Sequence, residues 1–357
     1  MERQPIQFFV RDLEGLLDEA RGALARFLHA EPKNLVMVPN ATAGVNTVLR
    51  SLQFKKGDEL LVTNHEYNAC RNALDFVAAF WHVRVIVAPI PFPLRNAGQI
   101  VEALLRCVTP RTRLALLDHV TSQTGLLFPI EQLTHELTAR GIDTLVDGAH
   151  APGMVSVNLR KLNATYYTGN CHKWLCAPKG AGFLYVRRDR QKIVRPLIIS
   201  HGANSPRRDR SRFLMEFGWT GTADLSAYLS VPKAVQYMGS LLPGGWADVI
   251  KHNHALAVAA RKVICGALNI ALPCPDELIA SLAAIPIPNA RTRTSPKSPL
   301  YLDPLQERLL REYNIEVPII PWPAPPRRIL RVSAQLYNRL PQYEQLAAAL
   351  VELGLAA

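Results

Sequence analysis

A single lysine, Lys173, lies in a stretch of sequence where a solvated surface charge would be out of place. The surrounding segment, YYTGNCHKWLCAPKGAGFLYV (Tyr166–Val186), is rich in glycine and small residues, and its apolar runs predict two buried strands joined by a loop. A lysine in a desolvated pocket has a lowered pKa and can form a Schiff base with an aldehyde. Lys173 is therefore the first candidate for a residue that does chemistry.

Two further segments place polar side chains where a predicted strand ends. In LVDGAHAPG (Leu145–Gly153) the strand ends in Asp147, whose buried carboxylate would need a cation such as a protonated ring nitrogen, unless Asp147 only caps a turn. In NHEYNAC (Asn64–Cys70), His65 and Tyr67 stand where a strand turns into a helix. Tyr67 could stack on a flat ring there, and a partly buried tyrosine with a bonded hydroxyl explains the segment equally well.

The segment VPNATAGVNTVLRSL (Val38–Leu52) predicts a strand end followed by a helix that begins with small residues. The N–H groups in the first turn of such a helix can bind an anion such as phosphate. An ordinary helix cap by Asn40 or Thr42 is the alternative. An anion site, an aromatic ring, a buried acid and a lysine are together what pyridoxal phosphate requires, and the combination is much rarer than any of its parts.

These segments belong to a regular alternation of apolar runs and amphipathic stretches. The runs predicted as strands are LVMVP, DELLVTN, VRVIVAPI, TRLALLDHV, DTLVDGAH, ATYYTGN and AGFLYVRR. Helices are predicted between them at residues 69–80, 97–107 and 130–140, and before them at 13–29. The alternation predicts an α/β domain with a mostly parallel seven-stranded sheet, in which ligands bind at the carboxyl ends of the strands.

The pattern changes after about residue 240. A helix is predicted at 246–268, then comes the proline-rich stretch IPIPNARTRTSPKSP, which is either an exposed loop or a strand edge, and the last helix is predicted at 343–353. We therefore predict a large α/β domain over residues 1–240 and a small α+β domain over residues 241–357.

Composition excludes several classes of protein. The chain of 357 residues is 48% hydrophobic and 20% charged, and no apolar run approaches the roughly 18 residues of a membrane helix. The formal net charge of +12 is spread along the chain, so nucleic-acid binding is not expected. Six scattered cysteines and an N-terminus without a secretion signal predict a cytoplasmic protein with reduced thiols and no metal site.

The motifs named so far, together with FVRDLEGLLDEAR and LRVSAQLYN, resemble those of the class V aminotransferase group of fold-type I pyridoxal-phosphate enzymes. Within that group they are most similar to the motifs of isopenicillin N epimerase-like proteins, with cysteine desulfurases and selenocysteine lyases more distant. The resemblance covers most of the chain. It implies pyridoxal 5′-phosphate as the cofactor and Lys173 as the lysine that forms the Schiff base.

The resemblance also implies a role for each motif residue. Asp147 would keep the ring nitrogen of the cofactor protonated, and Tyr67 would stack on the ring where related proteins place a histidine. His150 and Ser122 would approach the phenolic oxygen. The residues implied at the phosphate are Ala41, Thr42, Asn170 and His172.

Two further residues imply partners. Thr222, in GWTGTADLSAY, occupies the place from which members of this group reach the phosphate site of the neighbouring subunit, so a homodimer is implied. Arg331, in LRVSAQLYN, would bind the α-carboxylate of the substrate as a bidentate pair. The expected substrate is therefore an amino acid or a derivative of one.

Two departures from the pattern of the group affect the expected reaction. Related proteins usually carry further residues before FFVRDLEG, including a glycine-bearing stretch that closes over the substrate, whereas Met1 here precedes it almost directly. This predicts a truncated start or a more open site. Desulfurases also use a loop cysteine before the carboxylate-binding arginine, and no cysteine lies between Asp276 and Arg331. A cysteine-persulfide mechanism is therefore not expected.

The expected reaction begins when the amine of Lys173 takes the α-proton of the substrate. A proton returned to the opposite face gives epimerisation, for which His65 and Tyr67 are candidate donors. Loss of a β-sulfur substituent gives a C–S lyase, and protonation of the cofactor gives transamination. We expect an isopenicillin N epimerase-like epimerase. A C–S lyase acting on a cysteine derivative, an aminotransferase and a catalytically silent cofactor-binding scaffold are the alternatives.

Overall fold

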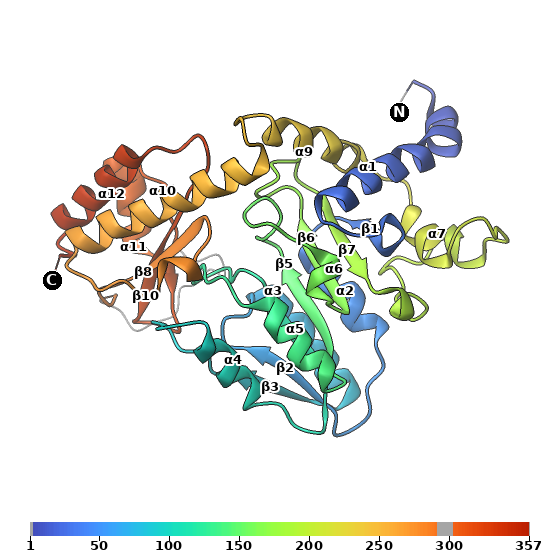
Figure 1. Cartoon of the computed structure of the whole chain (residues 1–357), viewed down its shortest axis with the longest axis horizontal. Helices are drawn as coiled ribbons and strands as arrows, with labels where there is room; N and C mark the ends of the chain where they lie inside the picture. Colours follow the sequence, from blue (N-terminus) through green and yellow to red (C-terminus); the bar gives the residue numbers. More distant parts are fainter. Residues whose placement is uncertain (1–2, 291–302, 357) are drawn as a thin grey trace.

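The computed structural model describes residues 3–290 and 303–356, and its central seven-stranded sheet confirms the predicted α/β fold (Figure 1). The strands are β1 (Leu35–Val38), β2 (Glu59–Thr63), β3 (Arg84–Ala88), β4 (Thr112–Asp118), β5 (Asp143–Gly148), β6 (Tyr166–Asn170) and β7 (Gly182–Val186). Their order in the sheet is β1-β7-β6-β5-β4-β2-β3. Six of the strands run in the same direction, and β7 runs in the opposite one. All seven coincide with the seven apolar runs of the sequence.

The reversed direction of β7 brings the carboxyl ends of the other six strands to one edge of the sheet, which we call the carboxyl edge. Gly182, the first residue of β7, stands opposite both Val38 at the end of β1 and Asn170 at the end of β6. Asp118 at the end of β4 stands opposite Asp147 of β5. Ligands of open α/β sheets bind outside such an edge.

Helices cover both faces of this sheet, as the alternating pattern predicts. One face carries α1 (Leu13–Phe27), α4 (Gly98–Leu105), α5 (Ile130–Ala139) and the short α6 (Leu159–Leu162). The other carries α2 (Ala41–Ser51), α3 (Asn68–Trp81) and α7 (Arg212–Gly218). Leu114 and Leu116 of β4 pack under α2 and α3, whereas Ala115 and Leu117 pack under α4 and α5, because successive side chains of a strand point to opposite faces.

A second, antiparallel sheet of three strands lies at the other end of the molecule (Figure 1). Its strands are β8 (Leu282–Ile287), β9 (Ile319–Pro321) and β10 (Arg328–Ser333), in the order β8-β10-β9. The helices around it are α10 (Trp246–Ala267), α11 (Pro304–Tyr313) and α12 (Leu340–Glu352), and α10 packs on both α12 and β8. The proline-rich stretch begins in β8, an edge strand, and continues into residues 291–302, which lie outside the described residues.

Two short helices, α8 (Ser226–Leu229) and α9 (Val231–Gly239), lead into α10, and α9 packs on α1. The two ends of the chain lie at opposite ends of the molecule, with α10 running between the two sheets (Figure 1). A division into domains at about residue 240 stays a prediction.

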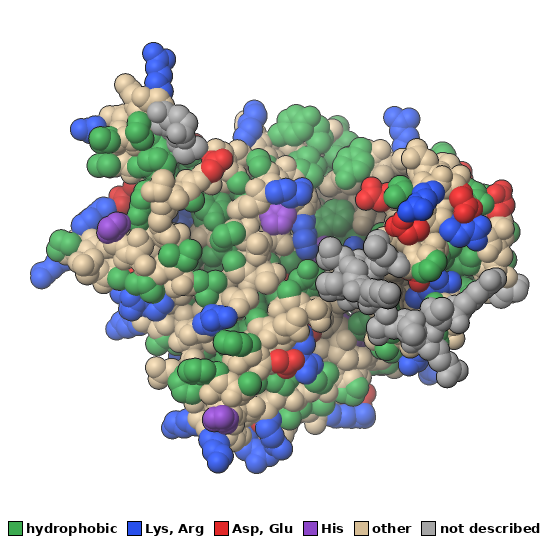
Figure 2. All heavy atoms as spheres, turned by 180° about the vertical axis from the view of Figure 1, so that it is seen from behind, with side chains coloured by type: hydrophobic (Ala, Val, Ile, Leu, Met, Phe, Trp, Pro, Cys, Tyr) green, Lys and Arg blue, Asp and Glu red, His purple; other side chains and the backbone are tan. Residues whose placement is uncertain are grey.

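Charged side chains are distributed unevenly over the surface. On the face opposite to that of Figure 1, Lys and Arg side chains lie scattered around the rim, and acidic side chains gather together with basic ones at the end that carries the small sheet (Figure 2). In the described parts of the chain, no helix combines the length and the apolar character needed to cross a bilayer. The cytoplasmic location stays a prediction.

Candidate active site

Lys173 lies in the loop between β6 and β7, at the carboxyl edge. The base of this loop is closed by the N–H of Cys171, which donates to the carbonyl of Ala181 at 2.9 Å. The backbone of Gly153, with a φ of +86°, comes so close to the loop that a Cβ there would lie 2.8 Å from the carbonyl of Trp174. Only glycine suits both the positive φ and this close approach, so the motif DGAHAPG fixes the loop that carries Lys173.

The side-chain amine of Lys173 contacts one imidazole. Its Nζ lies 2.9 Å from Nε2 of His150, and the indole N–H of Trp174 donates to Nδ1 of the same ring at 3.4 Å. Burial lowers the pKa of Lys173. Burial and the charges of Lys173 and Arg331 hold the pKa of His150 well below its usual value. A buried amine with a lowered pKa is the form of lysine that attacks aldehydes and accepts protons.

Asp147 is buried near the end of β5 and has hydrogen-bond donors on both carboxylate oxygens. The N–H of Ala149 donates to Oδ1 at 2.8 Å, and the thiol of Cys70 donates to Oδ2 at 3.2 Å. Burial raises the pKa of this carboxyl, and the charge of Lys173 opposes that shift. Asp147 forms no ion pair with another residue of the described chain. A protonated pyridine nitrogen would supply the missing cation, so the site fits pyridoxal phosphate.

The helix α2 begins at this edge, with Asn40 as its N-cap. Asn40 Oδ1 accepts the N–H of Ala43 at 2.8 Å, and Asn170 Oδ1 accepts the N–H of Ala41, also at 2.8 Å. The capping interpretation is therefore correct for Asn40, and the amide of Ala41 is occupied by Asn170. The structure brings Ala41, Thr42 and Asn170 together, while their roles toward a phosphate stay predictions that require Asn170 to release the Ala41 amide.

Tyr67 and His65 lie in very different environments. Tyr67 is the residue before α3, and 42% of its surface is exposed. His65 is fully buried: Nδ1 lies 2.7 Å from the hydroxyl of Thr124, Nε2 lies 3.1 Å from the carbonyl of Ile90, and the ring packs on Trp322. Burial lowers the pKa of His65 to about 4. Because both ring nitrogens are engaged, His65 does not fit as a proton donor to a substrate.

Arg331 of β10 reaches from the small sheet toward the large one. Its Nη1 donates to the backbone carbonyl of Ser122, and its Nε has no hydrogen-bond partner. Burial lowers the pKa of this guanidinium, and its charge lowers the pKa of Lys173 and His150, so the three groups share one region. A buried guanidinium with an unused donor fits a carboxylate ligand. Ser122 contacts Arg331 through its backbone carbonyl. The predicted contact of Ser122 with the phenolic oxygen of the cofactor stays a prediction.

Two predicted residues have no hydrogen bond to Lys173 in the described chain. The ring of His172 is fixed by its Nδ1, 2.9 Å from the carbonyl of Ala181. Thr222 lines a cavity of about 980 Å³ together with Lys179 and Gly180, the residues just before β7. This cavity lies between α1, β1 and the segment that leads to α8, and Lys173 does not line it. Within one subunit, the structure therefore does not bring Thr222 to the lysine.

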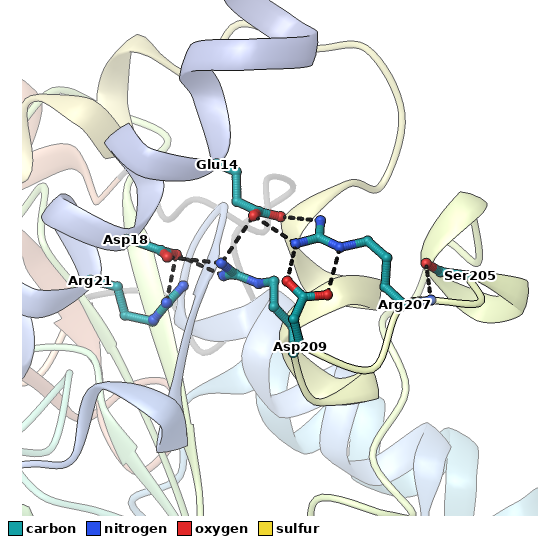
Figure 3. A network of polar contacts seen from close by, with 7 residues as sticks. Glu14, Asp18, Arg21, Ser205, Arg207 and Asp209 are labelled. Atoms are coloured by element: carbon teal, nitrogen blue, oxygen red, sulfur yellow. Dashed lines mark hydrogen bonds and ion pairs between the residues drawn. The ribbon is translucent and has the colours of Figure 1, made fainter.

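Beside this cavity lies the basic segment SPRRDRSRF, residues 205–213, whose Arg207 and Arg210 pair with acidic side chains (Figure 3). Arg207 binds Glu14 at 2.7 Å and Asp209 at 2.5 Å, and Arg210 binds Asp18 at 2.7 Å. Glu14 and Asp18 are one turn apart on α1, so these ion pairs attach the segment to that helix. The charges of Arg207 and Arg210 are therefore paired within the chain, whereas the neighbouring Arg208 is exposed.

Sequence reasoning missed three buried groups next to Asp147, namely Glu66, Cys70 and Asp118. All three stand in segments quoted above for other reasons, NHEYNAC and TRLALLDHV. The available signal was their position at or shortly after strand ends: Asp118 is the last residue of β4, and Glu66 and Cys70 follow β2. Their approach to Asp147 depends on the order and register of the strands, which the sequence does not reveal.

The chain belongs to the class-V aminotransferase family, whose model matches residues 9–294. This confirms the resemblance, the assignment as a pyridoxal-phosphate enzyme and the cofactor. The isopenicillin N epimerase of Amycolatopsis lactamdurans is 34% identical over 99% of this chain and 89% of its own length. That of Streptomyces clavuligerus is 31% identical over 97% and 87%. A probable chloroplastic L-cysteine desulfhydrase of Arabidopsis thaliana is 29% identical over 98% and 76%.

Solved structures share the fold. The apo cysteine desulfurase of Thermococcus onnurineus NA1 gives a TM-score of 0.78 at 19% identity, over 96% of this chain and 84% of that chain. The cystine C–S lyase C-DES in complex with its product cysteine persulfide gives 0.75 at 22% identity, over 96% and 88%. Both likenesses concern the fold alone.

Proposed function

We propose that this chain is an epimerase that removes and returns the α-proton of an amino acid or amino-acid derivative, with the amine of Lys173 as the base. The observation that carries the proposal is the contact of the partly buried Lys173 Nζ with His150, with the charges of Asp147 and Arg331 acting on the same amine. The amine of Lys173, the carboxylate of Asp147 and the guanidinium of Arg331 thus lie in one region of the carboxyl edge.

The cofactor supplies an aldehyde that captures the amino group of the substrate and a ring that withdraws electrons from its α-carbon. The chain does the rest. Arg331 binds the carboxylate and fixes the orientation of the substrate, since its unused Nε–H can complete a bidentate pair. Asp147 would hold the ring nitrogen of the cofactor in its protonated form. With the substrate bound, the uncharged Nζ of Lys173 would accept the α-proton.

Epimerisation needs the proton to return on the opposite face of the α-carbon. His65 is closed to that role, because Thr124 and Ile90 occupy both of its ring nitrogens. Tyr67, a partly exposed residue whose hydroxyl can donate a proton, is the remaining candidate among the residues considered. The two isopenicillin N epimerases, at 34% and 31% identity over nearly the whole chain, support epimerisation over other outcomes.

A second candidate is β-elimination from a cysteine derivative, supported by the likeness to a probable L-cysteine desulfhydrase over 98% of the chain. This reaction needs no donor on the opposite face and uses the same Lys173, Asp147 and Arg331. A persulfide route stays unsupported, because the chain has no cysteine between Asp276 and Arg331.

One experiment separates the two candidates. The cofactor-loaded protein is incubated with isopenicillin N and, separately, with L-cysteine, and the products are analysed by chiral chromatography and by assays for pyruvate and sulfide. An inverted α-centre without pyruvate supports the epimerase. Pyruvate and sulfide from L-cysteine, with no inversion of either substrate, would replace it with the C–S lyase.

We also propose that the protein acts as a homodimer in which Thr222 serves the phosphate site of the neighbouring subunit. The supporting features are the 980 Å³ cavity beside Thr222 and the exposed apolar side chains next to it. Val10 is 75% exposed, Leu197 47% and Ile198 62%, and all three line the cavity. Contiguous exposed apolar surface of this kind marks protein contacts.

Complementation between two inactive variants tests this arrangement. Lys173→Ala and Thr222→Val are each purified, unfolded together and refolded as a mixture. If Thr222 acts on the neighbouring site, a mixed dimer contains one complete site and recovers activity. A mixture as inactive as the two parents, although mixed dimers form, would place Thr222 in its own subunit's site or outside any site.

A further inference from the structure

Three carboxyl groups converge beneath the candidate active site. Asp118 ends β4 and Asp147 lies near the end of β5, in register side by side, and Glu66 lies in the loop between β2 and α3. Glu66, Asp118 and Asp147 are 7%, 2% and 3% exposed. Carboxylate oxygens of Glu66 and Asp147 and the sulfur of Cys70 all lie within 4.8 Å of one another.

Three buried anions at such distances are not stable together, because burial and mutual repulsion both favour the protonated form. Burial and the charge of Asp147 raise the pKa of Asp118 well above its usual value, and burial raises the pKa of Asp147. Lys173 is the cation that opposes both shifts. The other ionisable groups around them are Cys70, whose thiol already donates to Asp147, and His119, which is bound to Tyr167. At least one of the three carboxyl groups must therefore hold a proton.

The available donors decide which group is ionised. Asp147 accepts one hydrogen bond on each oxygen, from Ala149 and Cys70. No side chain of the described chain donates to Glu66 or to Oδ2 of Asp118, and the nearby backbone N–H of Tyr67 only partly offsets the raised pKa of Glu66. A proton between Glu66 and Asp118 would satisfy both groups, since their carboxyl groups lie within hydrogen-bonding reach. Burial and the charges of Asp118 and Asp147 raise the pKa of Glu66 well above its usual value.

We propose that Glu66 is a positioning residue that stays protonated and donates a hydrogen bond to Asp118, which leaves Asp147 as the carboxylate that faces the ring nitrogen of the cofactor. Because Glu66 stays uncharged, the Glu66–Asp118 pair adds one negative charge beside Asp147 rather than two. The part of this inference that concerns the ring nitrogen rests on the proposed role of Asp147. The part that concerns the proton of Glu66 rests on the chain alone.

Infrared spectroscopy of the cofactor-free protein tests the proton directly. The difference between wild type and Glu66→Gln at pH 7 is expected to contain the carbonyl band of a protonated carboxylic acid, which moves in deuterium oxide. The same difference for Glu102→Gln, an exposed residue of α4 that pairs with Arg106, should contain only carboxylate bands. A carboxylate signal from Glu66 at pH 7 would overturn the proposal.

A second measurement tests the pairing. In Asp118→Asn, the amide oxygen still accepts the proton of Glu66, but the neighbouring negative charge is gone. The acid band of Glu66 should then titrate about one pH unit or more below its midpoint in wild type, as expected for strongly coupled groups. An unchanged midpoint would mean that Glu66 and Asp118 do not share a proton.

A third measurement connects the pair to the reaction. Exchange of the substrate α-proton is measured per bound cofactor in Glu66→Ala and Glu66→Gln. We expect a loss of roughly tenfold or more in the alanine variant, in kcat rather than KM, with partial recovery by glutamine, whose amide can still donate to Asp118. If both variants exchanged the α-proton as fast per bound cofactor as wild type, Glu66 would have only a packing role. Absence of exchange in wild type would instead refute the proposed function, and the infrared results would stand.

Discussion

The Nζ of Lys173 lies 2.9 Å from Nε2 of His150, and Nδ1 of the same ring accepts the indole N–H of Trp174 at 3.4 Å. An imidazole that accepts a hydrogen bond at Nδ1 and is uncharged carries its proton on Nε2. His150 then donates to the lone pair of Lys173, which requires the amine to be neutral. The neighbouring residue in the sequence, Trp174, thus fixes the tautomer that favours the reactive form of Lys173.

Replacing Lys173 by alanine should remove covalent attachment of the cofactor and leave the fold intact. Borohydride treatment of the loaded wild-type protein should fix the cofactor on the peptide that contains Lys173, as mass spectrometry can show, because a buried amine of lowered pKa is the reactive one. Lys161→Ala, at an exposed lysine bound to Glu131, is the control and should keep the label. A label found on another lysine would contradict the assignment of Lys173.

Replacing Arg331 by alanine should weaken substrate binding more than turnover. Hydrogen bonds to charged groups contribute about 1.5–3 kcal/mol, so KM should rise on the order of 10- to 100-fold. Steady-state kinetics on an α-amino acid measures the change. Arg327→Ala, at an exposed position four residues earlier in the chain, should leave KM unaltered. Matching KM values for the Arg331 variant and wild type would remove Arg331 from the carboxylate site.

The buried His65 should make the protein sensitive to acid. Its pKa is lowered to about 4 from 6.5 by burial, so its stabilising contribution is complete above about pH 6.5 and is lost as the pH falls through about 4. The shift corresponds to about 3 kcal/mol of unfolding free energy. Urea unfolding between pH 7 and pH 4 should therefore show a shallower loss of stability in His65→Gln than in wild type. The control is His252→Gln, on an exposed position of α10, and a slope for His65→Gln as steep as the control's would refute the prediction.

The close approach of α2 to β6 depends on Gly44. A Cβ at this position would lie 2.0 Å from Oγ1 and 2.7 Å from Cβ of Thr168, so that helix and strand must separate. Gly44→Ala should cost about 1–3 kcal/mol of unfolding free energy and weaken cofactor binding, because the start of α2 moves. Gly15→Ala, where a Cβ meets no atom within 4 Å, should instead stabilise α1 by about 0.5–1 kcal/mol. Thermal and urea unfolding of both variants measure the contrast, and equal effects would contradict it.

The fold followed from the sequence because each strand and most helices have a clear local pattern. The runs around Asp147 and Lys173 are continuous apolar segments, as expected for strands buried on both faces, and the helix predicted at 246–268 is α10. The candidate lysine and acid could be found because each stands alone at the end of such a run.

Other parts of the site depend on tertiary contacts and were not predictable. The proximity of Glu66 and Asp118 to Asp147 follows from strand order, and β2, β4 and β5 are neighbours only in space. The bond from the Ala41 amide to Asn170 joins residues 129 positions apart. Besides the adjacent Asp209, the acidic partners of Arg207 and Arg210 lie on α1, nearly 200 residues earlier in the chain, so the sequence alone did not reveal these ion pairs.

The most direct test of the proposed function is deuterium exchange at the α-carbon of the substrate. The cofactor-loaded protein is mixed in deuterium oxide with isopenicillin N, L-cysteine conjugates and a set of L-amino acids, and proton NMR follows each α-proton signal. The proposal predicts loss of the α-proton signal from at least one of these compounds with wild type, and no loss with Lys173→Ala. Retention of every α-proton by the loaded wild-type protein, or exchange that persists without Lys173, would contradict it.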